Sequence, residues 1–163
     1  MVFLDLMKYS RLTKEQFESL HEDFSLFLAN QSIDKNQWDQ IKIENLILTD
    51  ELLDLFSDIV WDQSLEKISY LENRSDSHLF LFKCKNASID LILIRLEENC
   101  PSLMHKDYKQ WLSKNLSDPR VSIFESSRSF QENFKEEKFK LINQGASVSN
   151  GETFEYLKSF LLK

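Results

Sequence analysis

The sequence predicts an α+β fold, an antiparallel meander sheet of three to four strands packed by N-terminal and C-terminal helices. Three observations predict it. Apolar residues recur at helical spacing near both ends of the chain, apolar residues recur at every second position between residues 67 and 97, and short polar segments separate the strands there. Connections this short join antiparallel neighbours. The 163 residues fit a single domain over 1–163.

The N-terminal third of the chain is predicted to be helical. Thr13 and Gln16 form a capping box, and an apolar stripe follows it to about Ala29. A shorter helical segment is expected over 33–43, and a further helix is expected to start at Thr49. Residues 1–6 are either a short strand or an N-terminal extension ahead of a start at Met7, and the sequence leaves both readings open.

The central part of the chain changes to a period of two. Strands are predicted over 67–72, 78–85 and 88–97, and a fourth over 120–125. In the strand over 88–97 both parities are apolar, which predicts a central strand or one covered on both faces. We therefore expect cover on both sides of the sheet.

The remaining segments are predicted to be helical. Pro101 is expected to open one helix, a second is expected to run from Phe130 to Gly145, and Ser149 with Glu152 forms a capping box for the last.

Composition excludes several classes of function. The formal charge of −7 argues against nucleic-acid binding, which requires a basic surface, and also against anionic membrane surfaces. No apolar run reaches the roughly 18 residues of a membrane span. The two glycines exclude glycine-rich phosphate loops. Two cysteines without an export signal favour reduced thiols and a cytoplasmic protein.

No spacing of histidines and cysteines indicates a catalytic, cofactor or metal site. His21 lies in a Glu-x-x-His element that lacks the second copy a di-iron site needs. His78 and Cys84 share strand parity but would lie about 20 Å apart along a regular strand. Cys100 and His105 have no partner at metal-ligand spacing. We therefore expect no catalytic residue, no cofactor and no metal.

One surface pattern is unusual. Carboxylates recur every four residues along one predicted helix, at Asp50, Asp54, Asp58, Asp62 and Glu66. The first four are expected to be largely exposed and free of metal, because a convex helix face does not make carboxylates converge. The pattern has three readings: a plain solvent-facing side, a docking surface for a basic protein partner with Trp61 as anchor, and a weak metal site. On the first reading, changing Asp54 and Asp58 to Asn leaves stability unchanged or slightly higher.

Three stretches carry a family resemblance, KYSRLTKEQFESLHEDFSLFLANQSID, ELLDLFSDIVWDQSLEKISYLEN and FKLINQGASVSNGETFEY. The chain from Met7 resembles a small uncharacterised family of Bacteroidetes bacteria. The resemblance implies a cytoplasmic bacterial protein and assigns no activity or site residue. In layout the chain is also similar to small, acidic bacterial secretion-chaperone domains.

These observations favour a non-enzymatic, cytoplasmic protein-binding domain, of adaptor or chaperone-like character, that binds a protein partner or forms a homodimer. A sheet with two apolar faces needs cover that a second copy can supply. The alternative is a small enzyme that uses His78 or His105 with scattered carboxylates. A pocket with a histidine at its base favours the enzyme, and a flat apolar patch favours the binding protein.

Overall fold

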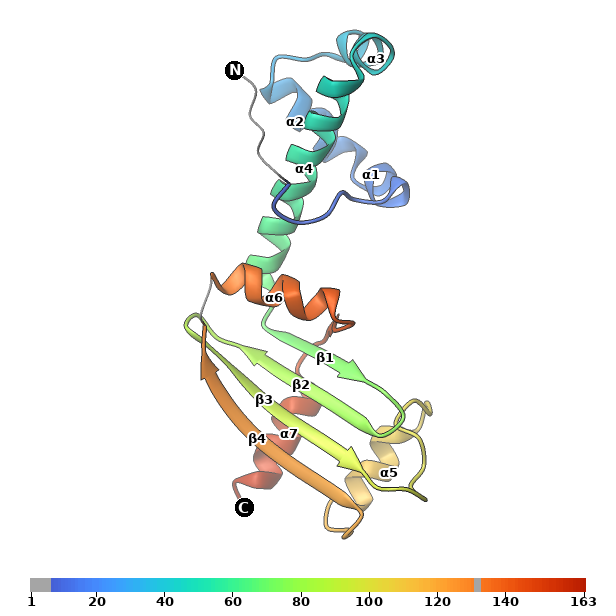
Figure 1. The fold of residues 1–163 in the computed structure, drawn as a ribbon, viewed down its shortest axis with the longest axis vertical. Helices are drawn as coiled ribbons and strands as arrows, with labels where there is room; N and C mark the ends of the chain where they lie inside the picture. The colour runs from blue at the N-terminus through green and yellow to red at the C-terminus, as the bar shows by residue number, and fades with distance from the viewer. Residues whose placement is uncertain (1–6, 131–132) are drawn as a thin grey trace. The chain divides into compact units, whose positions relative to one another are not determined.

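A computed structural model describes residues 7–130 and 133–163 of the chain (Figure 1). Residues 1–6, where the sequence allows a strand or an extension, lie outside the described residues. The chain divides into two compact units, residues 1–66 and 67–163, and each is described by itself. Folding as a single domain stays a prediction.

The first unit is helical. Its helices are α1 (Lys14–Ser19), α2 (His21–Asn30), α3 (Lys35–Glu44) and the long α4 (Leu46–Lys67). They enclose a small core whose buried side chains are Leu12, Phe27, Leu28, Leu52 and Phe56. Aromatic rings fill its centre, and the ring of Phe24 lies edge-on to that of Phe56 with 5.0 Å between the centroids. This packing gives short helices the stability that they lack alone.

The capping box at the start of the first helix is confirmed. The Thr13 hydroxyl accepts the Gln16 N–H at 3.2 Å, and the Gln16 side chain accepts the Thr13 N–H at 2.8 Å. The helix predicted to reach Ala29 is nevertheless broken into α1 and α2. Leu20 leaves helical geometry, with φ −107° and ψ 22°, so the chain turns there.

The long helix α4 starts one turn earlier than predicted. Asn45, not Thr49, lies at its start, where the Asn45 side-chain oxygen accepts the Leu48 N–H at 3.0 Å. An asparagine there satisfies a donor that the first turn leaves unpaired.

The second unit contains the antiparallel sheet, in the order β4-β3-β2-β1-β5. Its strands are β1 (Tyr70–Arg74), β2 (His78–Cys84), β3 (Ser88–Leu96), β4 (Val121–Ser129) and β5 (Ser147–Val148). The predicted α+β meander is confirmed, because β1 to β4 pair in sequence order. The short β5, which the sequence analysis missed, pairs with the outer side of β1.

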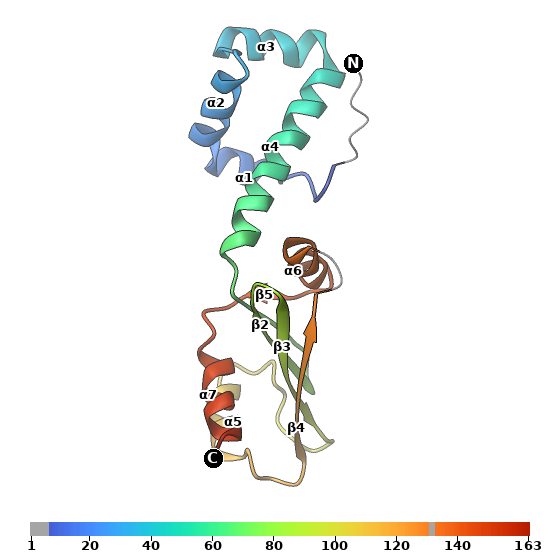
Figure 2. The same ribbon diagram turned by 90° about the vertical axis from the view of Figure 1, so that its left-hand side faces the viewer.

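Helices lie on both faces of this sheet (Figure 2). On one face are α5 (Tyr108–Lys114) and α7 (Glu152–Leu161), and on the other is α6 (Phe134–Asn143). The core under α5 and α7 is the larger, and Leu79, Ile92 and Ile94 are almost completely buried in it. Under α6, a smaller core contains Leu71, Cys84, Ile89 and Ala146.

Three predicted helix starts in this unit are wrong. The helix expected to run from Phe130 begins only at Phe134, with Asn133 as its N-cap. The helix expected after Pro101 begins only at Tyr108, because residues 103–107 form turns. The last helix has Gly151, at φ 82°, as its N-cap in place of Ser149, and the Asn150 side chain accepts the Glu152 N–H at 3.1 Å. A left-handed residue there favours glycine.

Candidate functional site

The acidic ridge, defined as Asp50, Asp54, Asp58 and Asp62, runs along α4 as the spacing predicts. The structure pairs it with a segment of the same unit, the N-terminal strap (residues 8–12). Asp58 holds the backbone of this strap. Its two carboxylate oxygens accept the N–H groups of Lys8 at 2.8 Å and Tyr9 at 2.9 Å. Hydrogen bonds to a charged acceptor are stronger than those between neutral groups.

Cationic side chains of the strap pair with the ridge. Arg11 lies over one end, with its Nε 2.7 Å from Asp54 Oδ1 and its Nη1 3.2 Å from Asp50 Oδ1. The hydrogen bond to Asp54 raises the pKa of the Arg11 guanidinium, and burial acts in the opposite direction. Lys8 Nζ lies 3.6 Å from Asp62. The charges of the ridge therefore have counterions within the chain.

The strap ends in the core of the first unit. Leu12 is buried, and its N–H donates to the hydroxyl of Ser57 at 3.0 Å. Ser57 is completely buried on α4 and donates to the Leu53 carbonyl at 2.7 Å. A buried serine that accepts one backbone bond and donates another fixes the register of strap against helix.

The ridge is less exposed than predicted. The exposed fraction of the side chain is 62% for Asp50 but only 32% for Asp54 and 39% for Asp62, because the strap covers them. Trp61 is half-buried and packs against the core, with its ring 6.5 Å from that of Tyr9. Docking of an external basic partner on these residues stays a prediction, and it now requires the strap to leave.

The three histidines lie in different surroundings. His21 Nδ1 lies 3.1 Å from the Glu18 carbonyl oxygen within the first unit. His78 Nδ1 lies 2.8 Å from the Ser77 hydroxyl, and its ring stacks on Phe80. In residues 7–130 and 133–163, no three His, Cys, Asp or Glu side chains are grouped to hold a metal ion. Burial raises the pKa of the Cys84 thiol, which disfavours the reactive thiolate.

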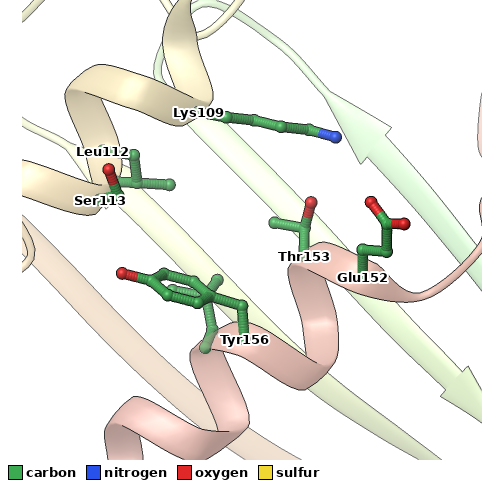
Figure 3. Close-up of a pocket in the computed structure, with 7 residues that line it drawn as sticks. Lys109, Leu112, Ser113, Glu152, Thr153 and Tyr156 are labelled. Atoms are coloured by element: carbon green, nitrogen blue, oxygen red, sulfur yellow. The ribbon is translucent and has the colours of Figure 1, made fainter.

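One small pocket lies between α5 and α7 and has a volume of about 240 Å³ (Figure 3). It is lined by Lys109, Leu112, Ser113, Glu152, Thr153, Tyr156 and Leu157. Figure 3 shows Lys109 extending from α5 towards the side of α7 that carries Glu152 and Thr153. Two leucines, one cation and one anion can hold a small polar molecule, but the lining contains no histidine or cysteine.

Another pocket, of about 230 Å³, lies at the start of α5 and is lined in part by His105. Its other lining residues are Pro101, Ser102, Leu103, Asp107, Tyr108 and Trp111. The His105 side chain is 62% exposed and its Nδ1 lies 3.9 Å from the Asp107 carboxylate, so the histidine is at the rim and not at the base. The Ser102 hydroxyl donates to Asp76 at 2.5 Å. A serine nucleophile would instead donate its proton to the histidine that acts as its base.

The second unit carries an apolar surface on the sheet face that α6 only partly covers. Pairing places Phe80, Leu93 and Phe124 directly opposite one another across β2, β3 and β4. In the next row Leu91 lies opposite Phe82, which is packed in the core under α6. We call Phe80, Leu91, Leu93 and Phe124 the open-face strip.

The strip is accessible at the surface. Phe80, Leu91 and Leu93 are half-buried, and Phe124 is 47% exposed. Arg95 borders it, with its guanidinium 5.4 Å from the Phe124 ring centre. The doubly apolar pattern of β3 was the sequence signal for this surface. Phe124 was missed because the pairing partner of β4 is not visible in sequence.

An α+β protein with a half-covered antiparallel sheet is the class that this fold and surface define. Residues 7–162 match the model of DUF6495, a family of unknown function, and the chain belongs to that family. Neither the curated proteins nor the solved structures contain a match. Among the described residues, no helix combines the length and apolarity needed to cross a membrane.

Proposed function

We propose that this chain is a non-enzymatic protein-binding domain, and that the open-face strip is the surface that receives its partner. The observation that carries the proposal is the row Phe80, Leu93 and Phe124, which lines three adjacent strands and remains partly accessible. Rigid aromatic side chains on a sheet present apolar area at little cost in conformational entropy, and aromatic residues including Phe are enriched in protein interfaces.

The residues that border the open-face strip indicate the kind of partner. Arg95 is exposed, and it lies directly opposite His78 across β2 and β3. On the same face, the β4 residues beside the strip are Ser122 and Ser126, which carry no charge. An amphipathic segment with apolar residues along one side and a carboxylate near Arg95 would complement this surface.

The cellular setting is part of the same proposal. We propose a bacterial, cytoplasmic adaptor or chaperone-like role. The free thiols of Cys84 and Cys100 support a reducing compartment. The small pocket with His105 and Asp107 is the place where the alternative, a small enzyme, would have its site.

Capture from a lysate of the native host, read by mass spectrometry, tests the proposal with matched variants. Phe124→Ser removes the most exposed side chain of the strip, and Arg95→Glu reverses the charge of the residue that borders it. Val148→Ser, at a position that is 62% exposed on β5, is the control. We expect the first two variants to lose one specific captured protein, by tenfold or more for Phe124→Ser.

Binding measurements on the purified complex then test which kind of segment the strip binds. The captured protein is expected to bind the wild type through an apolar and acidic segment, and a peptide of that segment should compete. Capture that is the same for the wild type, Phe124→Ser and Arg95→Glu contradicts the proposal. Loss with Val148→Ser as well contradicts a role specific to the strip.

A further inference from the structure

The outer edge of β4 is unpaired by any other strand of the described sheet, because β4 is first in the order and has only β3 beside it. The hydrogen bonds at both ends of the β3–β4 pair fix which groups point outwards. Phe130 N–H donates to Ala87 and Glu97 N–H donates to the Arg120 carbonyl, so even-numbered residues of β4 point towards β3. By alternation, the N–H and C=O groups of Ile123, Glu125, Ser127 and Ser129 point outwards.

This edge has few of the features that keep edge strands from pairing. β4 is nine residues long and contains no proline and no lysine. From Phe124 to Ser129 every residue is exposed. Strands of this kind readily accept another strand.

The side chains of β4 distinguish between the registers in which two copies could pair about a twofold axis. An axis through Glu125 places two carboxylates directly opposite each other, which is unfavourable. An axis through Phe124 places Ile123 opposite Glu125 of the second copy. An axis through Ser126 places Glu125 opposite Ser127 and Phe124 opposite Arg128, with the small serines at the centre.

The Ser126 register repeats a contact that the chain already makes. Phe124 lies beside Arg95 in a cation–π arrangement, and the same ring would meet Arg128 of the second copy. The Arg128 side chain is 52% exposed, and its Nη2 donates to Glu137 at 3.0 Å. This hydrogen bond uses the edge of the planar guanidinium, so its flat face can still stack on an aromatic ring.

We propose that two copies of this chain form a dimer through antiparallel β4–β4 pairing over residues 123–129, centred on Ser126. The dimer has one continuous sheet and brings two open-face strips side by side, with Arg128 of each copy at the edge of the other's strip. The pairing is isologous, and each copy supplies the same outward backbone groups. It goes beyond the proposed function, since it rests on the edge of β4 and not on partner binding.

A cysteine placed at the axis tests the register. In the full chain with Cys100→Ser, Ser126→Cys puts two thiols opposite each other in a non-hydrogen-bonded pair, about 4.5 Å apart between Cα atoms. Ser122→Cys, on the same strand and face, is the matched control because its pairing partner is not itself. We expect mild oxidation to give a covalent dimer with Ser126→Cys and not with Ser122→Cys.

Light scattering at tens of micromolar tests the dimer itself. Ser127→Pro removes an outward N–H that the β3 ladder does not use, and Ser127→Ala controls for the lost side-chain bond to Asp90. We expect dimers for the wild type and Ser127→Ala and a monomer for Ser127→Pro. A monomeric wild type, or equal cross-linking at positions 122 and 126, overturns the proposal.

If Ser127→Pro fails to fold, as circular dichroism would show, the two cysteine variants decide. A dimer that forms without cross-linking at position 126 uses another surface and also overturns the proposal. The strip is unchanged in these variants, so a failed dimer and a failed partner capture are separate results.

Discussion

Replacing Asp58 by asparagine should loosen the N-terminal strap and destabilise the first unit. In the wild type, both carboxylate oxygens accept strap N–H groups, from Lys8 at 2.8 Å and Tyr9 at 2.9 Å. Asparagine keeps one oxygen and turns an NH₂ donor towards the second N–H. The variant loses one charge-assisted hydrogen bond and weakens the other, which costs about 1–2 kcal/mol at this partly exposed site.

The other ridge positions should follow a graded order. Asp54→Asn removes a 2.7 Å contact with Arg11, but both side chains are about a third exposed, so the cost is about 0.5 kcal/mol. Asp50, with 62% of its side chain exposed, should contribute within error of zero. This order differs from the expectation for a purely solvated ridge, in which asparagine at positions 54 and 58 leaves stability unchanged or slightly higher.

Urea unfolding measures the cost, and hydrogen exchange at the Lys8 and Tyr9 amides locates it. Glu66→Gln is the matched control, because it removes the next carboxylate of the same four-residue series, at an exposed position, and should change stability by a few tenths of a kcal/mol at most. If Asp58→Asn is as stable as Glu66→Gln and its two amides exchange no faster, the strap does not depend on the carboxylate.

Two further predictions concern the second unit. The hydrogen bond from Lys83, and then that from Tyr70, lower the pKa of Glu155, so this pairing stabilises the fold above the ordinary carboxyl pKa and is lost as pH falls through the lowered value. Lys83→Met should return the Glu155 pKa towards its ordinary value, as an NMR titration would show. An unchanged Glu155 pKa would rule out the Lys83 hydrogen bond as the cause. Gly151→Ala should cost about 2 kcal/mol or more in thermal unfolding, since φ is 82° and a Cβ would lie 2.5 Å from the Tyr70 ring. Gly145→Ala, whose Cβ would meet Asn73 at 3.5 Å, should cost less, and an equal loss in both variants would contradict the role of the ring.

The helix faces, the strands and the meander could be predicted from the sequence, because these features depend on local periodicity. It also showed the carboxylate spacing of the ridge. What occupies the ridge was beyond such reasoning, because Arg11 and Asp54 are 43 positions apart and nothing in the strap distinguishes a docked segment from a solvated one. Long-range pairing has no local signature.

The open face was only half predictable for a related reason. Both parities of β3 are apolar, which predicted cover on each side, but burial differs between them: Ile92 and Ile94 are buried, whereas Leu91 and Leu93 are half-buried. Hydropathy shows that a residue favours burial, but it does not show whether a helix covers that residue in the fold. The extension of β4 beyond Glu125 was missed because a ladder of backbone bonds needs no apolar side chains.

The position of β1 between β2 and β5 has a consequence for how the second unit folds. Its bonds to β2 close a short hairpin, whereas its bonds to β5 join Leu71 to Val148, across most of the unit's length. Hairpins form within microseconds, while a contact between distant residues must first overcome the entropy of closing the loop. We expect the meander to assemble first, with the pairing of β5 as a late step in the folding of this unit.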